Sequence, residues 1–127
     1  MLSFPIVAVH QFNESTSKIT GGRFGVVADI QRTSFFECAI GREVNDDETE
    51  KLLSDIADSG VDFVVMTGDM IYNGADEEHW HWFDYLMERS GLAEGGKSVL
   101  PVLGNHEYWG NDGKGLNNLR ERFQNNK

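Results

Sequence analysis

Cysteine, positive charge and long apolar runs are all scarce in this 127-residue sequence, and each scarcity excludes a class of protein. Cys38 is the single cysteine, which excludes an intrachain disulfide framework and a zinc site built from several thiolates. No apolar run approaches the roughly 20 residues that a membrane-spanning helix needs. Lys and Arg number 11 against 21 Asp and Glu, so the formal net charge of -10 disfavours binding to nucleic-acid backbones and anionic membranes.

The residues that are present fit one globular domain. Apolar residues make up 39% of the chain and charged residues 25%, which is enough to build a packed core. Met1–Val9 is apolar but short, and no Lys or Arg precedes it, so we expect an initial strand there rather than a signal peptide. Without a targeting or membrane segment, we expect a cytoplasmic location.

Short apolar runs alternate with helical patterns along the chain. The predicted strands are Phe24–Ala28, Val61–Thr67 and Ser98–Leu103. The predicted helices run from a cap at Asn45 or Asp46 to Gly60, over Asp76–Arg89, and from Leu116 to Phe123. The nearly continuous run at Phe24–Ala28 is typical of a strand covered on both faces. This alternation predicts an α/β fold of mostly parallel strands joined by right-handed crossover helices.

Polar side chains follow each of these three strands. Asp29 and Gln31 come after the first strand, Asp69 after the second, and Asn105 and His106 after the third. Because ligands of open parallel sheets bind beyond the carboxyl ends of the strands, we expect these residues to converge at one edge. Carboxylate, amide and imidazole groups suit two divalent ions of Mn, Fe, Zn or Mg, and Asp69 on the middle strand could bridge them.

The motifs that contain these residues resemble those of a known enzyme family. They are Asp29-Ile30-Gln31, Gly68-Asp69-Met70-Ile71-Tyr72-Asn73-Gly74 and Gly104-Asn105-His106-Glu107. In this order they are similar to the first three motifs of the calcineurin-like metallophosphoesterases, over about Phe24 to Trp109. The resemblance implies the first half of a four-layer α/β/β/α sandwich and the hydrolysis of a phosphomonoester or phosphodiester.

The resemblance also implies a role for each residue. Asp29 would bind the first metal, Asp69 would bridge both metals, and Asn105 would bind the second. A hydroxide held between the metals would attack phosphorus, while His106 would stabilise the transition state and protonate the leaving oxygen. Gln31 stands where the family often has histidine, so it would either bind a metal through its amide oxygen or orient a water molecule.

Three aromatic residues near these motifs have two interpretations each. Tyr72 stands three residues after Asp69, where purple acid phosphatases have an iron-binding tyrosinate. Because Gln31 does not match the first motif of that subgroup, we interpret Tyr72 as a wall or packing residue. Tyr108 and Trp109 either line the pocket or pack within their loop.

The length of the chain departs from the family pattern, which continues with a further histidine and then a Gly-His-x-His block. This sequence has four histidines in all and no such block, so we expect residues 1–127 to form a truncated N-terminal part of the domain. Alone it would bind metal poorly and turn over slowly or not at all. The alternative is a non-catalytic fragment that folds, or that forms a homo-oligomer through its open sheet edge, without metal chemistry.

Two other patterns are interpreted as structural. Gly91–Ser98 satisfies the P-loop expression GxxxxGK[ST], but a helix precedes it and a strand follows it, which inverts the order that phosphate binding requires. His79 and His81 lie two residues apart on a predicted helix, so their imidazoles point in different directions and would not share a metal. Trp80 and Phe83 fall on the helix stripe that we expect to pack against the sheet.

Overall fold

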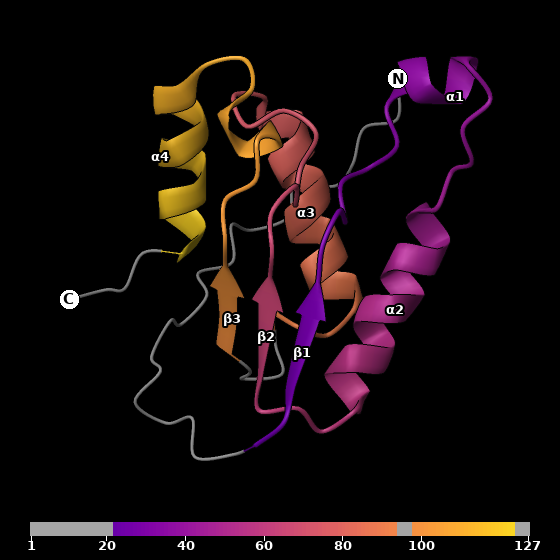
Figure 1. The fold of residues 1–127 in the computed structure, drawn as a ribbon, viewed down its shortest axis with the longest axis vertical. Helices are drawn as coiled ribbons and strands as arrows, with labels where there is room; N and C mark the ends of the chain where they lie inside the picture. Colours follow the sequence, from indigo (N-terminus) through magenta and orange to yellow (C-terminus); the bar gives the residue numbers. More distant parts are fainter. Residues whose placement is uncertain (1–21, 94–97, 124–127) are drawn as a thin grey trace.

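The structure, a computed structural model, describes residues 22–93 and 98–123 (Figure 1). The predicted strand at Met1–Val9 and Lys97 of the P-loop pattern lie outside the described residues. Three parallel strands form one sheet in the order β1-β2-β3, with bounds Phe24–Val27, Phe63–Met66 and Ser98–Pro101. The helices are α1 (Phe35–Ala39), α2 (Asp46–Asp58), α3 (Glu77–Arg89), α4 (Asp112–Phe123) and the short 3-10 helix η2 (His106–Tyr108). The predicted α/β fold and its parallel strands are therefore confirmed.

The strands pair in register, which decides where the connecting loops emerge. Val27 lies opposite Met66, and Met66 lies opposite Pro101, so all three strands end at the same level. Figure 1 shows the three arrows pointing the same way, with the segments after them at one edge of the sheet. This edge is where the sequence predicted that the polar side chains would meet.

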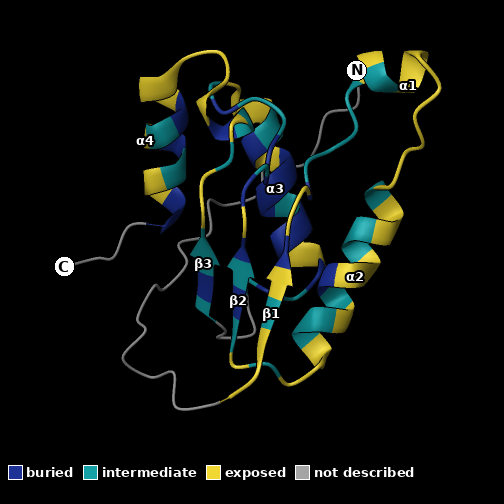
Figure 2. Ribbon diagram, in the orientation of Figure 1, coloured by how far each residue is buried: buried dark blue, intermediate teal, exposed yellow. Residues whose placement is uncertain are grey.

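The core lies on one face of the sheet. Side chains alternate between the two faces of a strand, and Val27, Val64 and Val99 point to the face that α2 and α3 cover. The largest core side chains of these two helices are fully buried, and they include Leu53, Trp80, Phe83, Leu86 and Met87 (Figure 2). The predicted packing of the Trp80 and Phe83 stripe is confirmed.

The opposite face is open among the described residues. Phe24 and Val26 are each 57% exposed, and the Phe24 ring stacks on that of Phe63 at 5.3 Å between centroids. The prediction that this strand is covered on both faces is therefore wrong for the part of the chain that the structure describes. The physical reason is that α2 and α3 lie on one side of the sheet, so only every second side chain of β1 is covered.

Helix boundaries follow their capping residues in most cases. The helix α2 begins directly after Asn45 with a first turn of acidic residues, and Gly60 follows its end with a φ of 71°. The side chain of Asp76 accepts a hydrogen bond from the Glu78 amide at the start of α3. The helix α4 begins at Asp112, four residues before the predicted start at Leu116, while α1 and η2 were not predicted. No helix in the described ranges is long and apolar enough to cross a membrane.

Candidate active site

Asp29 and Asp69 occupy equivalent positions beyond neighbouring strands. Each lies two or three residues after its strand ends, and their φ angles are 52° and 51°. These values fall in the left-handed region, which non-glycine residues rarely adopt and which Asp tolerates better than most. Backbone conformations of this kind concentrate at functional sites because the surrounding structure must impose them. Both aspartates are therefore held in the same unusual conformation at the same sheet edge.

Hydrogen bonds connect the three segments that follow the strands. The Asp29 amide donates to the Gly68 carbonyl at 3.3 Å, which joins the first segment to the second. The His106 amide donates to Oδ1 of Asp69 at 3.1 Å, which joins the second to the third. These two hydrogen bonds link the segments that carry Asp29, Asp69 and His106.

Gly68 and Gly104 allow this close approach. A Cβ atom on Gly68 would lie 2.7 Å from the Gly104 nitrogen, and one on Gly104 would lie 2.2 Å from Oδ1 of Asp69. Gly68 also has a φ of 100°, which a side chain would disfavour. The close contact between the two segments therefore requires glycine before Asp69 and before Asn105.

Glu107 supports both segments, although the sequence assigned it no role. Its side chain is fully buried, and its carboxylate accepts three backbone hydrogen bonds. The donors are the amides of Asp69 at 3.0 Å, Met70 at 2.7 Å and Gly104 at 2.6 Å. A charged acceptor forms stronger hydrogen bonds than a neutral one, so Glu107 holds the Asp69 segment and the Gly104 segment together.

The imidazole of His106 has a fixed orientation and a defined tautomer. Its Nδ1 atom lies 2.7 Å from the carbonyl oxygen of Tyr72. A carbonyl can only accept a hydrogen bond, so Nδ1 carries a proton and Nε2 is the nitrogen left for chemistry. The ring also packs on Trp109, with centroids 3.8 Å apart, and lies 5.4 Å from the Tyr72 ring.

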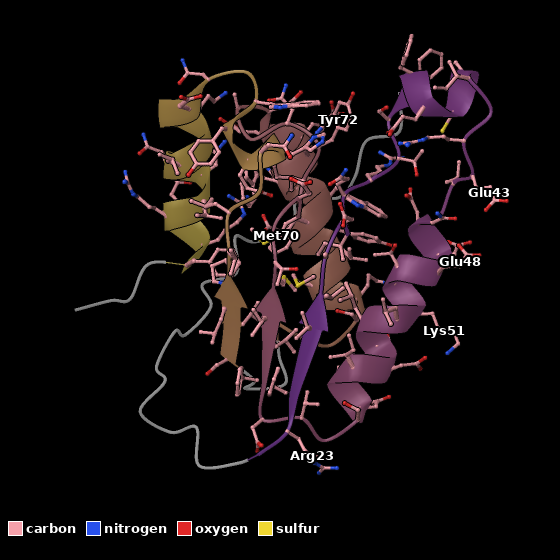
Figure 3. All side chains as sticks on the ribbon, viewed as in Figure 1. Arg23, Glu43, Glu48, Lys51, Met70 and Tyr72 are labelled. Atoms are coloured by element: carbon pink, nitrogen blue, oxygen red, sulfur yellow. The ribbon has the colours of Figure 1, made fainter. Side chains whose placement is uncertain are left out.

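Tyr72 forms part of the wall beside His106. Figure 3 shows Tyr72 beyond the carboxyl ends of the strands, past Met70 along the same segment. Its ring lies 5.6 Å from that of Trp109 in an edge-to-face arrangement and 5.5 Å from that of His79. These contacts favour the wall interpretation of Tyr72. They also show that Trp109 contacts the site through His106.

Gln31 and Asn105 are the two predicted amide ligands. Oε1 of Gln31 is buried and has no hydrogen-bond partner among the described residues, which is costly unless another group satisfies it. The side chain of Asn105 is exposed and forms no capping hydrogen bond with η2. A buried amide oxygen that shares a polar pocket with Asp29 is a chemically suitable donor for a divalent cation, so Gln31 and Asp29 fit the predicted group.

The described residues contain no group of three or more His, Cys, Asp or Glu side chains placed to hold a metal ion. The predicted ligand set contains only two such side chains, Asp29 and Asp69. Its other members, Gln31 and Asn105, have amide side chains and so do not belong to the His, Cys, Asp and Glu class. The ligand set therefore remains a prediction.

A polar pocket of about 380 Å³ opens beside Asp29 and Gln31. Glu37 lines it, and hydrogen bonds from Ser34 and then the ion pair with Arg42 lower the pKa of the Glu37 carboxyl below its usual range. Arg42 is thus paired with Glu37 within the protein. The pocket provides space for a charged group next to the first predicted ligands.

His79 gives the folded protein a pH dependence. Burial lowers the pKa of His79 from 6.5, although the charges of Asp76 and Glu78 act against this shift. As the pH decreases below 6.5, His79 binds a proton in the unfolded chain at a higher pH than in the folded chain. The free energy of unfolding should therefore fall over this range. We expect His79→Gln to reduce this slope below pH 6.5, measured by urea unfolding at several pH values. The exposed His81→Gln is the matched control, and an unchanged slope in His79→Gln would contradict the prediction.

The geometry defines an α/β protein whose polar site is built by three parallel strand ends at one sheet edge. A family model described as calcineurin-like phosphoesterase matches residues 22–127. The chain therefore belongs to the calcineurin-like phosphoesterase family. A comparison with curated proteins found no match.

Proposed function

We propose that this chain carries the metal-binding edge of a phosphoesterase that hydrolyses a phosphomonoester or phosphodiester. Membership of the calcineurin-like phosphoesterase family supports the class of reaction. The observation that carries the proposal is the hydrogen-bonded convergence of Asp29, Asp69 and His106 at the carboxyl edge of the sheet. The two aspartates, with φ angles of 52° and 51°, supply acidic side chains beyond neighbouring strand ends, where they would hold the metal ions.

Asp29, Gln31, Asp69 and Asn105 would hold two divalent metal ions. The orphaned Oε1 of Gln31 supports its inclusion, since a cation would satisfy that oxygen. When bound, the ions would lower the pKa of water and neutralise charge on the phosphoryl oxygens. Carboxylate and amide donors favour a class of divalent ions, here Mn, Fe, Zn or Mg, and not one member of it.

His106 would act on the leaving group. In the reaction, a bond forms between phosphorus and a water oxygen while the bond between phosphorus and the leaving oxygen breaks. Protonated His106 donates a proton from Nε2 to that leaving oxygen, and the attacking water releases a proton to solvent. The Tyr72 carbonyl keeps Nδ1 occupied at 2.7 Å, so the ring presents Nε2 and no alternative nitrogen.

Four ligands are too few for two ions, since each needs at least about four donors. We therefore propose that residues 1–127 provide the N-terminal part of the site and that further ligands are needed for full activity. For the isolated chain we expect weak metal binding and slow turnover.

Metal binding tests the ligand assignment. Calorimetric titration measures the affinity of the chain for Mn²⁺. Asp69→Asn should lower this affinity by at least about tenfold, because the amide lacks the charge that attracts the ion. Asn retains the oxygen that accepts from the His106 amide, so the fold is kept. Asp47→Asn on the exposed start of α2 is the matched control. Equal Mn²⁺ affinity in Asp69→Asn and the parent chain would contradict the assignment.

A further inference from the structure

A second pocket, of about 390 Å³, also borders the segment that follows β1. Three parts of the chain form it. Phe35 and Cys38 come from α1, Tyr72 from the segment after β2, and His79 and Trp82 from α3. A volume of this size is sufficient for a small organic group.

This pocket adjoins the candidate active site on two sides. Tyr72 in its wall contacts His106, with ring centroids 5.4 Å apart. Thr33 lines both this pocket and the polar pocket that contains Asp29 and Gln31. A molecule with its phosphorus at the strand ends could therefore extend its remaining part past Tyr72 into this space.

The walls present flat π surfaces. Tyr72, His79 and Trp82 contribute rings. The Trp82 ring is covered by the Arg32 guanidinium, 5.2 Å from its centre, and by the stacked Tyr85 ring at 5.6 Å, so it bounds the pocket without a free face. Phe35 is 90% exposed, which is unusual for a large apolar side chain at the rim of a pocket. Planar aromatic ligands stack on such rings, and this stacking gives a more favourable binding free energy than contact with an alkyl group of equal size.

The position of α1 depends on local hydrogen bonds that keep this wall in place. Ser34 and Glu37 form a reciprocal capping box at its start, with Glu37 N to Ser34 Oγ at 3.2 Å and Ser34 N to Glu37 Oε2 at 3.0 Å. Asp46 accepts from Arg32 Nε at 3.4 Å, which ties the preceding segment to the start of α2. Phe35 and Cys38 are thus held over the pocket by the folded chain itself.

We propose that this pocket binds a planar aromatic leaving group of the phosphoester substrate. The proposal rests on the proposed function, because it places the phosphorus at the Asp29 and Asp69 edge. Tyr72 would stack against the leaving group, Trp82 would bound the pocket, and Phe35 would close over the leaving group from α1. His106, which contacts Tyr72, would then stand beside the oxygen that joins this group to phosphorus.

Cys38 provides a direct probe, because it lines the pocket and is the single cysteine of the chain. The full chain with Mn²⁺ is alkylated with iodoacetamide, and the rate is followed by intact mass. Phenylphosphonate, whose phosphorus–carbon bond is not hydrolysed, should slow alkylation by roughly fivefold at saturation. Methylphosphonate at the same concentration should leave the rate within about twofold of the unliganded chain.

Phe35→Ala should abolish the protection by phenylphosphonate, because it removes an exposed wall ring without disturbing the core. Phe36→Ala is the matched control, since Phe36 is 70% exposed on the same helix and does not line the pocket. Equal protection by the two phosphonates, or none by phenylphosphonate in a chain that binds Mn²⁺ through Asp69, overturns the pocket proposal and leaves the proposed function standing. Absence of Asp69-dependent Mn²⁺ binding overturns the proposed function and this inference with it.

Discussion

Glu107→Gln should lower the free energy of unfolding by about 3 kcal/mol, because one buried amide loses its acceptor and the other two lose a charged one. The carboxylate accepts from Asp69 and Gly104 through Oε2 and from Met70 through Oε1. Glutamine can accept through one of these positions only, and its NH₂ group at the other position would face a backbone N–H. Urea unfolding monitored by tryptophan fluorescence measures the loss.

The same substitution should also weaken Mn²⁺ binding, because Glu107 fixes the segment that carries Asp69. The exposed Glu121→Gln on α4 is the matched control and should change the free energy of unfolding by less than about 0.5 kcal/mol. If Glu107→Gln unfolds at the same urea concentration as the parent chain, Glu107 does not hold the two segments together.

Arg122→Met should destabilise the protein by about 3–5 kcal/mol, because it leaves the charge of Asp84 buried without a partner. Nε of Arg122 donates to Oδ1 of Asp84 at 2.8 Å, and Nη2 of Arg122 donates to Oδ2 at 2.6 Å. Both side chains are almost completely buried. Arg122 also lies over the Trp80 ring, with its guanidinium carbon 4.9 Å from the ring centre. This pair ties α4 to α3.

The double variant Asp84→Leu with Arg122→Met distinguishes a loss of pairing from a loss of packing. Replacing a whole buried ion pair by apolar residues is often neutral, so the double variant should recover most of the stability lost in Arg122→Met. Arg120→Met, an exposed position on the same helix, is the matched control. Equal destabilisation in the single and double variants would show that the charge of Asp84 is not what makes Arg122 necessary.

The local patterns of the sequence predicted the sheet and the residues at its edge. Strand positions followed from short apolar runs, and their parallel order followed from the alternation with helices. Parallel strands in register end at one level, so the segments that carry Asp29 and Asp69 had to begin beside each other once the strands were placed. The contact of His106 with Asp69 follows from the same geometry.

Two features that the sequence did not predict depend on contacts distant along the chain. Glu107 reaches Asp69 across 38 residues, and Arg122 reaches Asp84 across the same separation. No periodicity indicates that a particular charged residue will be buried or which partner it will meet. Only the folded arrangement of β2, α3 and α4 decides these pairs.

The helix α1 was missed although a local signal for it exists. Ser34 followed three residues later by Glu37 is a capping-box pattern, and both of its hydrogen bonds are present. The helix is only five residues long and buries none of them, so it has no apolar stripe to reveal it. The capping pattern alone could have placed its start.

The most direct test of the central claim is anomalous X-ray diffraction from crystals of the full chain soaked in Mn²⁺. The account predicts an anomalous peak at the sheet edge, with carboxylate oxygens of Asp29 or Asp69 about 2.2 Å from the ion. A peak that lies only among Glu43, Asp46 and Thr49 of the polar pocket, or no peak at the strand ends at saturating Mn²⁺, would contradict it.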